Sequence, residues 1–202
     1  AQSLTSGIGV QWPGHLNINN TFPVAPTFNL LVANFGVTGN AIFSAGGGAN
    51  GVNLNNFTLF VGGNFTNNSG YTGGSNGFVS LNGGGAQTVA GSAAFYNIEV
   101  DKAAGVATFD DVTGGIVTYT ITGTFNLTNS AVAVGAGGPD VIAFNNATTA
   151  PTIVRNAGSF AGAPTFTSDV NVVYIGASKT FSNEVPVGGS NRLVNLTIAT
   201  TG

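Results

Sequence analysis

Acidic side chains carry most of the chemistry that this sequence could support. A glycoside hydrolase needs two carboxylates on either side of one bond, and a calcium site needs several oxygen ligands at one point. Asp110 and Asp111 are the only adjacent pair of acidic residues. Successive residues of a β-strand point to opposite faces, so these two carboxylates converge only if they lie in a turn. The seven acidic residues are Glu99, Asp101, Asp110, Asp111, Asp140, Asp169 and Glu184.

Asp140 gives a separate indication of calcium binding. It lies in Gly138-Pro-Asp-Val-Ile142, which resembles one unit of a glycine- and aspartate-rich calcium-binding repeat. Such sites need several stacked copies, and this sequence has one. We therefore expect Asp110 and Asp111 to lie in a solvated turn. Calcium binding by Asp110, Asp111 and Asp140 is the alternative, catalysis ranks behind both, and no other cofactor is expected.

Several other kinds of site are excluded by residue type. The chain has no Cys, so it has no thiolate metal site and no Cys nucleophile. His15 is the only His, which excludes a His-based metal site within one chain, and nothing places a Ser and an Asp beside it. The glycine clusters at 46–48 and 83–85 lack the Lys and the helix of a phosphate-binding loop. Trp12, the sole Trp, could stack on a sugar ring or close one end of the core. We expect no catalytic residues and no enzymatic activity.

The low charge of the chain excludes further classes of partner. Charged residues make up 5% of the 202 positions, the net charge is −3, and Lys and Arg together number four. A nucleic-acid-binding protein needs clustered basic residues to displace counterions, and an anionic membrane surface needs them as well. No apolar run approaches the length of about 20 residues that a transmembrane helix requires. We expect neither nucleic-acid binding nor membrane insertion within this segment.

The elements that must position these residues are β-strands. Helical periodicity is nearly absent, whereas alternation of apolar and polar residues is frequent and is bounded by Gly, Asn and Ser. Clear examples are Phe57–Val61, Phe78–Leu81, Ile116–Ile121 and Val170–Ile175. Such a density of short strands is typical of a sandwich, a barrel or a solenoid.

Internal repeats favour the solenoid. Phe95-Tyr-Asn-Ile-Glu-Val100 recurs as Leu193-Val-Asn-Leu-Thr-Ile198, and Gly63-Asn-Phe65 recurs as Gly123-Thr-Phe125. The order of such elements is kept while their spacing drifts, which stacked coils tolerate because each coil contacts only its neighbours. The predicted fold is therefore an all-β, parallel β-solenoid or β-helix-like stack of short strands, with an array of β-sandwiches as the alternative.

The repeated polar and glycine positions are expected to form the corners of the coils. Asn97 and Asn195 can bond to the backbone or stack on an Asn of the next coil, and Gly63 and Gly123 suit turns. We interpret all four as structural repeat positions and not as ligand-binding residues. Glu99, Asp101 and Lys102 lie at the end of a predicted strand, where we expect exposure to solvent or a weak surface ion pair.

The succession of Gly-x-Phe, Ala86-Gln-Thr-Val-x-Gly91 and Phe95-Tyr-Asn-Ile-x-Val100 resembles the β-rich repeats of very large secreted surface proteins of Bacteroidetes. The resemblance is to gliding or attachment adhesins exported by the type IX secretion route. It is strongest over residues 81–106, weaker over 174–202, and extends from about residue 56 onward. It implies an extracellular, cell-attached filamentous protein that acts in adhesion, and it carries over no catalytic residue.

Residues 1–55 match this pattern less well and are predicted to be a capping or terminal region. Residues 56–202 are predicted to be a β-repeat array that continues beyond residue 202 in a longer protein. The function expected is that of a structural and adhesive module whose partners are other surface-protein segments, copies of itself or extracellular polysaccharide. The alternatives are a filament subunit that assembles by strand exchange through residues 1–30 and a carbohydrate-binding or carbohydrate-processing β-helix.

Overall fold

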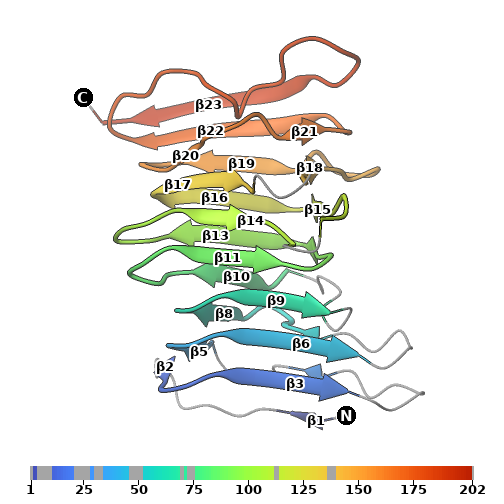
Figure 1. The fold of residues 1–202 in the computed structure, drawn as a ribbon. Helices are drawn as coiled ribbons and strands as arrows, with labels where there is room; N and C mark the ends of the chain where they lie inside the picture. The colour runs from blue at the N-terminus through green and yellow to red at the C-terminus, as the bar shows by residue number, and fades with distance from the viewer. Residues whose placement is uncertain are drawn as a thin grey trace.

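The computed structural model of the chain describes residues 2–3, 11–20, 28–29, 34–45, 52–68, 71, 76–111, 114–135 and 140–201. These residues form β-strands that pair in parallel, and no helix occurs among them. The chain winds in successive coils, so that each strand lies beside the equivalent strand one coil later (Figure 1). The architecture is the predicted parallel β-solenoid, and the sandwich alternative is wrong. Nothing in the described part of the chain is a helix suited to crossing a membrane.

The longest sheet runs the length of the stack and contains nine strands among the residues that the structure describes. In spatial order these are β2 (Gln11–Trp12), β5 (Phe35–Val37), β8 (Thr58–Val61), β10 (Phe78–Leu81), β13 (Asn97–Asp101), β16 (Thr124–Asn129), β19 (Thr152–Arg155), β22 (Val170–Gly176) and β23 (Leu193–Thr200). Their order in space is their order in sequence, which is the arrangement of a solenoid face.

The other faces are built in the same way. A seven-stranded sheet contains β3 (Leu16–Asn20), β6 (Ala41–Ala45), β9 (Phe65–Asn68), β11 (Gln87–Ala90), β14 (Ala107–Phe109), β17 (Ala131–Val134) and β20 (Ser159–Phe160). A four-stranded sheet contains β12 (Ala94–Phe95), β15 (Thr118–Ile121), β18 (Val141–Phe144) and β21 (Thr165–Phe166). A three-stranded sheet contains β1 (Gln2–Ser3), β4 (Phe28–Asn29) and β7 (Val52–Asn53).

Alternation along each strand fills the interior of the coils. In β8, Leu59 and Val61 are fully buried while Thr58 and Phe60 are half-buried. β-Branched and aromatic residues suit this half-buried, pleated surface. Three of the strands expected from alternation are present as β8, β10 and β22. In the fourth, the strand begins only at Thr118, and Ile116 is 71% exposed, because the chain is still turning a corner there.

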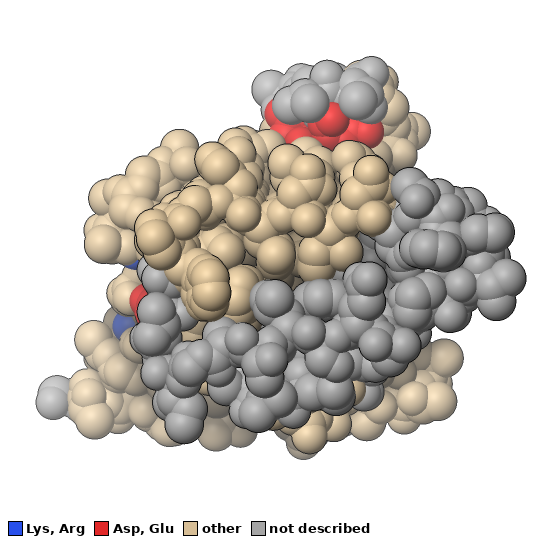
Figure 2. Space-filling view, turned by 90° about the horizontal axis from the view of Figure 1, so that it is seen from below, with Lys and Arg blue, Asp and Glu red and all other residues tan. Residues whose placement is uncertain are grey.

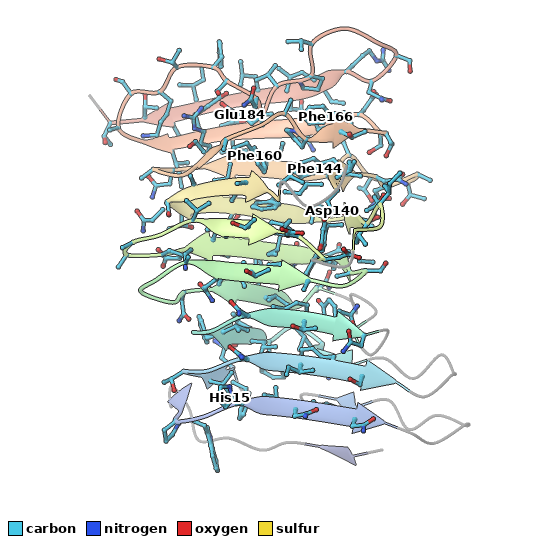
Figure 3. The ribbon with its side chains drawn as sticks, in the orientation of Figure 1. His15, Asp140, Phe144, Phe160, Phe166 and Glu184 are labelled. Carbon is cyan, nitrogen blue, oxygen red and sulfur yellow. The ribbon has the colours of Figure 1, made fainter. Side chains whose placement is uncertain are left out.

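Aromatic rings of neighbouring coils stack inside the solenoid. Phe65 contacts Phe43 at 5.4 Å between ring centroids and Phe95 at 5.4 Å. Farther along, Phe144 lies between Phe125, at 6.1 Å, and Phe166, at 5.7 Å. Figure 3 shows Phe144, Phe160 and Phe166 following one another along the stack. Contacts at these centroid distances add stabilisation beyond the burial of area.

The coils differ in length, and their corners absorb the difference. Val79 and Ile98 are register partners 19 positions apart, whereas Phe125 and Ile153 are partners 28 positions apart. The strands therefore keep their register while the connections between them vary. Strand pairing also runs through the predicted domain boundary at residue 55, since β5 and β6 pair with β8 and β9. The role of residues 1–55 as a capping region stays a prediction.

Candidate functional sites

The structure brings together the three acidic residues that the sequence offers as metal candidates. Asp110 and Asp111 follow β14, and Asp140 precedes β18 in the next coil. One carboxylate oxygen from each residue lies within 4.8 Å of the other two. Seen from below, acidic side chains gather at one projecting corner of the molecule (Figure 2). Asp110 and Asp111 converge because both lie outside the strand, where the alternation of faces no longer holds.

Backbone contacts hold this acidic corner in place. Asp140 is 7% exposed, and its Oδ1 accepts a hydrogen bond from the Val117 N–H at 2.8 Å. Its Oδ2 accepts from the Asp111 N–H at 3.1 Å, which ties the two coils together. Gly135 allows Asp110 to approach, since a Cβ there would lie 2.2 Å from the Asp110 carboxylate. Backbone N–H groups therefore fix the Asp140 carboxylate, and Gly135 leaves room for that of Asp110.

Tyr119 of β15 belongs to the same corner. Its ring packs edge-on against Phe109, with 5.2 Å between centroids, and its side chain is fully buried. Within the described part of the chain, its hydroxyl has no hydrogen-bond partner. Burial raises the pKa of Tyr119, and the charges of Asp140, Asp111 and Asp110 raise it further. Sequence alternation identifies Tyr119 as a strand residue, but only the fold shows that its hydroxyl lies near these acids.

Lys102 corrects an expectation, because it is 2% exposed and not at the surface. Its Nζ donates to the carbonyl oxygens of Gly83, at 3.0 Å, and Gly85, at 2.6 Å, and to Gln87 Oε1 at 2.6 Å. The Gln87 side-chain amide donates in turn to the Val61 carbonyl at 2.8 Å. Burial lowers the pKa of Lys102. The lysine therefore joins the corners of neighbouring coils. The sequence does not predict this role, because the nearby acids Glu99 and Asp101 suggest an ordinary surface position.

A buried ionic network near the C-terminal end was not expected from the sequence. Glu184 is fully buried, and its Oε1 pairs with Arg155 and accepts a hydrogen bond from Tyr174 Oη at 2.6 Å. Its other carboxylate oxygen is buried and has no partner among the described residues. Burial raises the pKa of Tyr174, and the hydrogen bond to Glu184 adds to this effect. Glu184 lies in the connection between β22 and β23, so the network anchors that connection to the core.

The two repeated asparagines lie in the nine-stranded sheet: Asn97 begins β13, next to a corner, whereas Asn195 lies inside β23 and not at the expected corner. Asn97 is 6% exposed. Its Oδ1 accepts from the Thr124 N–H at 2.8 Å and its Nδ2 donates to the Asn76 carbonyl at 3.2 Å. Asn195 is exposed and donates to Asn171 Oδ1 at 2.8 Å. Both side chains bond to a neighbouring coil.

The two repeated glycines occupy different corners of the coil. Gly63 precedes β9 of the seven-stranded sheet, whereas Gly123 precedes β16 of the nine-stranded sheet. The Gly-x-Phe pattern marks entry into a strand and does not specify which face the strand joins. Both glycines still face the preceding coil closely: a Cβ would lie 2.4 Å from Asn40 Oδ1 at Gly63 and 2.5 Å from the Tyr96 carbonyl at Gly123.

The sole His, His15, lies near the N-terminal end of the stack, far from Asp140 and Glu184 (Figure 3). The sole Trp, Trp12, lies in β2, the first strand of the nine-stranded sheet. His15 Nδ1 accepts a hydrogen bond from the Asn40 N–H at 2.9 Å. Trp12 is 53% exposed, and its ring lies 6.4 Å from that of Phe35. A ring this exposed is available for stacking and does not fill the core.

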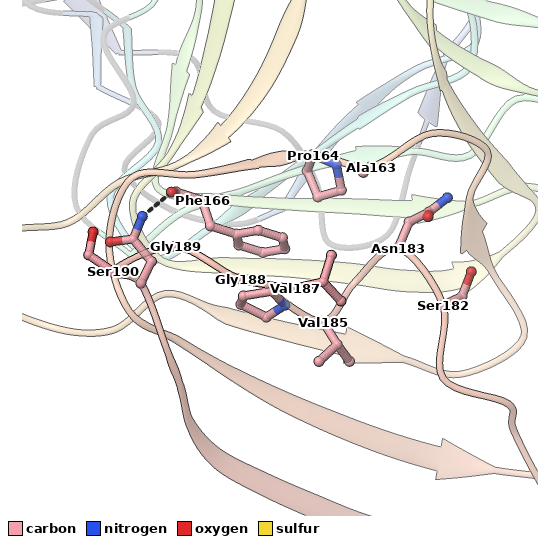
Figure 4. Close-up of a pocket in the computed structure, with 12 residues that line it drawn as sticks. Ala163, Pro164, Phe166, Ser182, Asn183, Val185, Val187, Gly188, Gly189 and Ser190 are labelled. Atoms are coloured by element: carbon pink, nitrogen blue, oxygen red, sulfur yellow. Dashed lines mark hydrogen bonds between the residues drawn. The ribbon is translucent and has the colours of Figure 1, made fainter.

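An open groove of about 400 Å³ lies between β21 and the connection that precedes β23 (Figure 4). Phe166, Val185 and Val187 contribute apolar side chains to its lining. Asn191 Nδ2 donates to the Phe166 carbonyl and closes one side of the groove. The polar groups that line it come from Ser182, Asn183, Ser190 and Asn191. This set contains no titratable side chain.

No known protein family, characterised protein or solved structure matches this chain.

Proposed function

We propose that this chain is a non-catalytic structural and adhesive module of an extracellular surface protein or filament. Its nine-stranded parallel ladder supports this proposal, because stacked coils make a rigid rod from nearest-neighbour contacts alone. The resemblance to repeats of type IX-secreted adhesins supports the extracellular bacterial location.

The observation that carries the proposal is the edge strand β23. It pairs with β22 on one side and ends the nine-stranded sheet. Leu196 and Ile198 are register partners of the core residues Val172 and Tyr174, so they continue the inward-facing rows. They are nevertheless 41% and 61% exposed. An exposed edge strand with an apolar row is a template for pairing with another β-strand. We therefore propose that this edge pairs with a β-strand of another surface-protein segment or of a second copy of the chain.

Surface labelling of the source organism tests the location and the adhesive role together. Antibody fragments raised against the chain are expected to label intact, non-permeabilised cells and to reduce their attachment to surfaces. Labelling only after permeabilisation would contradict the extracellular assignment. Labelling of intact cells without any effect on attachment would contradict the adhesive role.

The second candidate function, self-assembly, rests on the same edge. A second copy that pairs with β23 forms a head-to-tail contact, and such contacts propagate into filaments. Light scattering and negative-stain images are expected to show concentration-dependent rods one coil wide. Leu196→Lys combined with Ile198→Lys should abolish them, whereas Val106→Lys, at an exposed corner, should not. A chain that stays monomeric at all concentrations would exclude this candidate. The strand-exchange prediction for residues 1–30 falls mostly outside the described residues.

A further inference from the structure

The acidic corner has the dimensions of a cation site. One oxygen each from Asp110, Asp111 and Asp140 lies within 4.8 Å of the others. Calcium binds oxygen at about 2.3–2.6 Å, so two of its ligands are separated by at most about 5 Å. All three carboxylates can therefore reach one calcium ion without a large movement of the backbone. They come from two successive coils, which an ion at this point would bridge.

A second and independent feature points to the same spot. Tyr119 is fully buried, yet its hydroxyl has no hydrogen-bond partner among the residues that the structure describes. A buried hydroxyl without a partner costs free energy, and native structures rarely leave one so. Tyr119 follows Val117, whose N–H binds Asp140, by two residues, and its ring packs against Phe109, which directly precedes Asp110. In agreement with this placement, the charges of all three aspartates raise the pKa of Tyr119. A hydrated ion among the carboxylates would supply the missing partner.

We propose that Asp110, Asp111 and Asp140 bind one calcium ion that clamps two successive coils, with the Tyr119 hydroxyl contacting the ion or its bound water. This site is independent of the proposed surface function and goes beyond it. The ion contributes no catalysis in this proposal. It neutralises three carboxylates that the fold holds close together, and it fixes the corner between β14 and β15 against the corner before β18.

The chemistry of the donors selects calcium over other metals. All of the donors are oxygens, which disfavours zinc and copper because these prefer nitrogen and sulfur ligands. Magnesium needs near-octahedral oxygens at about 2.0–2.1 Å and keeps most of its water. Calcium accepts irregular sites and fills its remaining positions with water and carbonyl oxygens. Asp140, held by two backbone N–H groups, is the preorganised ligand.

Terbium luminescence and calorimetry test the proposal on the whole chain. Tb³⁺ substitutes for Ca²⁺, and excitation of a nearby tyrosine sensitises its emission. We expect sensitised emission that added Ca²⁺ quenches, one Ca²⁺ bound per chain by calorimetry, and a higher melting temperature with Ca²⁺. Magnesium should compete weakly. Asp140→Asn keeps an acceptor for the backbone and should weaken Ca²⁺ binding at least about tenfold, since affinity follows ligand charge.

Two further variants make the result specific. Asp169→Asn is the matched control, because Asp169 pairs with Arg192 at another corner, and it should bind Ca²⁺ as the parent does. Tyr119→Phe should lose the sensitised emission while calorimetry still detects Ca²⁺. If Asp140→Asn does not fold by circular dichroism, Asp110→Asn replaces it. The proposal is wrong if the folded parent shows no heat and no melting shift up to about 10 mM Ca²⁺, beyond the range of weak extracellular sites. It is equally wrong if Asp140→Asn and Asp169→Asn bind alike.

Discussion

At the scale of single residues, the buried charges are the most informative feature of a chain with so few of them. Glu184 is fully buried and Arg155 is 13% exposed in their ion pair, whereas Asp169 and Arg192 are 32% and 79% exposed in theirs. Removing one partner of a buried pair leaves the other charge buried without a counter-charge. This lowers the free energy of unfolding far more than breaking an exposed pair does. The two pairs therefore allow an internal comparison.

Glu184→Gln should lower the free energy of unfolding by about 3 kcal/mol, because it leaves the Arg155 guanidinium inside the protein without its counter-charge. Asp169→Asn should lower it by about 0.5 kcal/mol or less. Urea unfolding measures both values. The double variant Arg155→Met with Glu184→Gln should recover much of the loss, since no charge is then left unpaired. Equal effects of the two single variants would contradict this account of the network.

Buried tyrosines predict how stability depends on pH above neutrality. Burial raises the pKa of Tyr71 above its ordinary value of about 10. Above pH 10 or so, the unfolded chain loses this phenolic proton while the folded chain keeps it. The folded state then binds more protons, and the free energy of unfolding falls by about 1.4 kcal/mol per pH unit for each such group. Below that pH the contribution of Tyr71 is fully present.

The variant Tyr71→Phe should therefore lose less stability than the parent as the pH rises above about 10. Urea unfolding at several pH values around 11 measures the free energy of unfolding of both proteins. Burial lowers the pKa of Lys102, so at this residue the unfolded chain binds more protons than the folded chain, and the effect on stability has the opposite sign. It contributes equally to both proteins, so their difference isolates Tyr71. An unchanged alkaline slope in Tyr71→Phe would show that Tyr71 retains no such proton.

At the scale of the elements, alternation predicts the strands well and the corners poorly. Val170–Ile175 is predicted as a strand and forms most of β22, because alternate burial is encoded in each strand by itself. Gly63 and Gly123 look equivalent in sequence but lie at different corners, because a local pattern carries no information on which face comes next. The burial of Lys102 and Glu184 is not predicted from the sequence, because it depends on connections between strands of neighbouring coils.

The corner glycines should tolerate an added methyl group only where the neighbouring coil leaves space. Gly123→Ala would place a Cβ 2.5 Å from the Tyr96 carbonyl, and Gly63→Ala would place one 2.6 Å from the Gly39 carbonyl carbon. We expect each to lower the free energy of unfolding by about 1–3 kcal/mol, as overpacking does. At Gly84 a Cβ meets nothing within 4 Å, so Gly84→Ala should be nearly neutral. A chemical unfolding series that ranks all three alike would refute the close approach of the coils.

Asn97 and Asn195 separate a buried coil-to-coil bond from an exposed one. Asn97→Ala leaves the Thr124 N–H and the Asn76 carbonyl without their partner, and we expect a loss of about 2 kcal/mol. Asn195→Ala removes a bond that water can replace, and we expect a loss of about 0.5 kcal/mol or less. Thermal and urea unfolding give both values. A larger loss at Asn195 would place the main polar support at the open edge.

At the scale of the whole molecule, stability and shape both follow from stacking. At about 4.8 Å per coil, the nine-stranded sheet extends roughly 40 Å along the axis. The coil lengths vary between 19 and 28 positions. Asp110, Asp111 and Asp140 meet because the corners align after one coil, and that alignment cannot be read from a sequence whose repeat length drifts. The sequence therefore predicts the solenoid but not the convergence of the acidic residues.

A solenoid should survive the loss of one complete coil, because each coil contacts only its neighbours. Thr58 and Phe78 are register partners, as are Leu59 and Val79. Deleting residues 59–78 joins Thr58 to Val79, so that β10 pairs with β5. Leu81, whose partner in the parent is Val61, then lies beside Val37. We expect a folded protein with an unchanged β-type circular dichroism spectrum. Its urea m-value should be lower, in proportion to the surface removed.

Deleting only residues 59–68 provides the contrast, because it removes β9 and all of β8 except Thr58 but leaves the rest of the coil. The following strands would then meet partners from other faces, and inward residues would lose their register. We expect this variant to be unfolded or aggregated. If the full-coil deletion fails to fold while the half-coil deletion folds, the coils are not independent repeating units. Folding of the full-coil deletion would show that the chain builds its core coil by coil, as a module that supplies length requires.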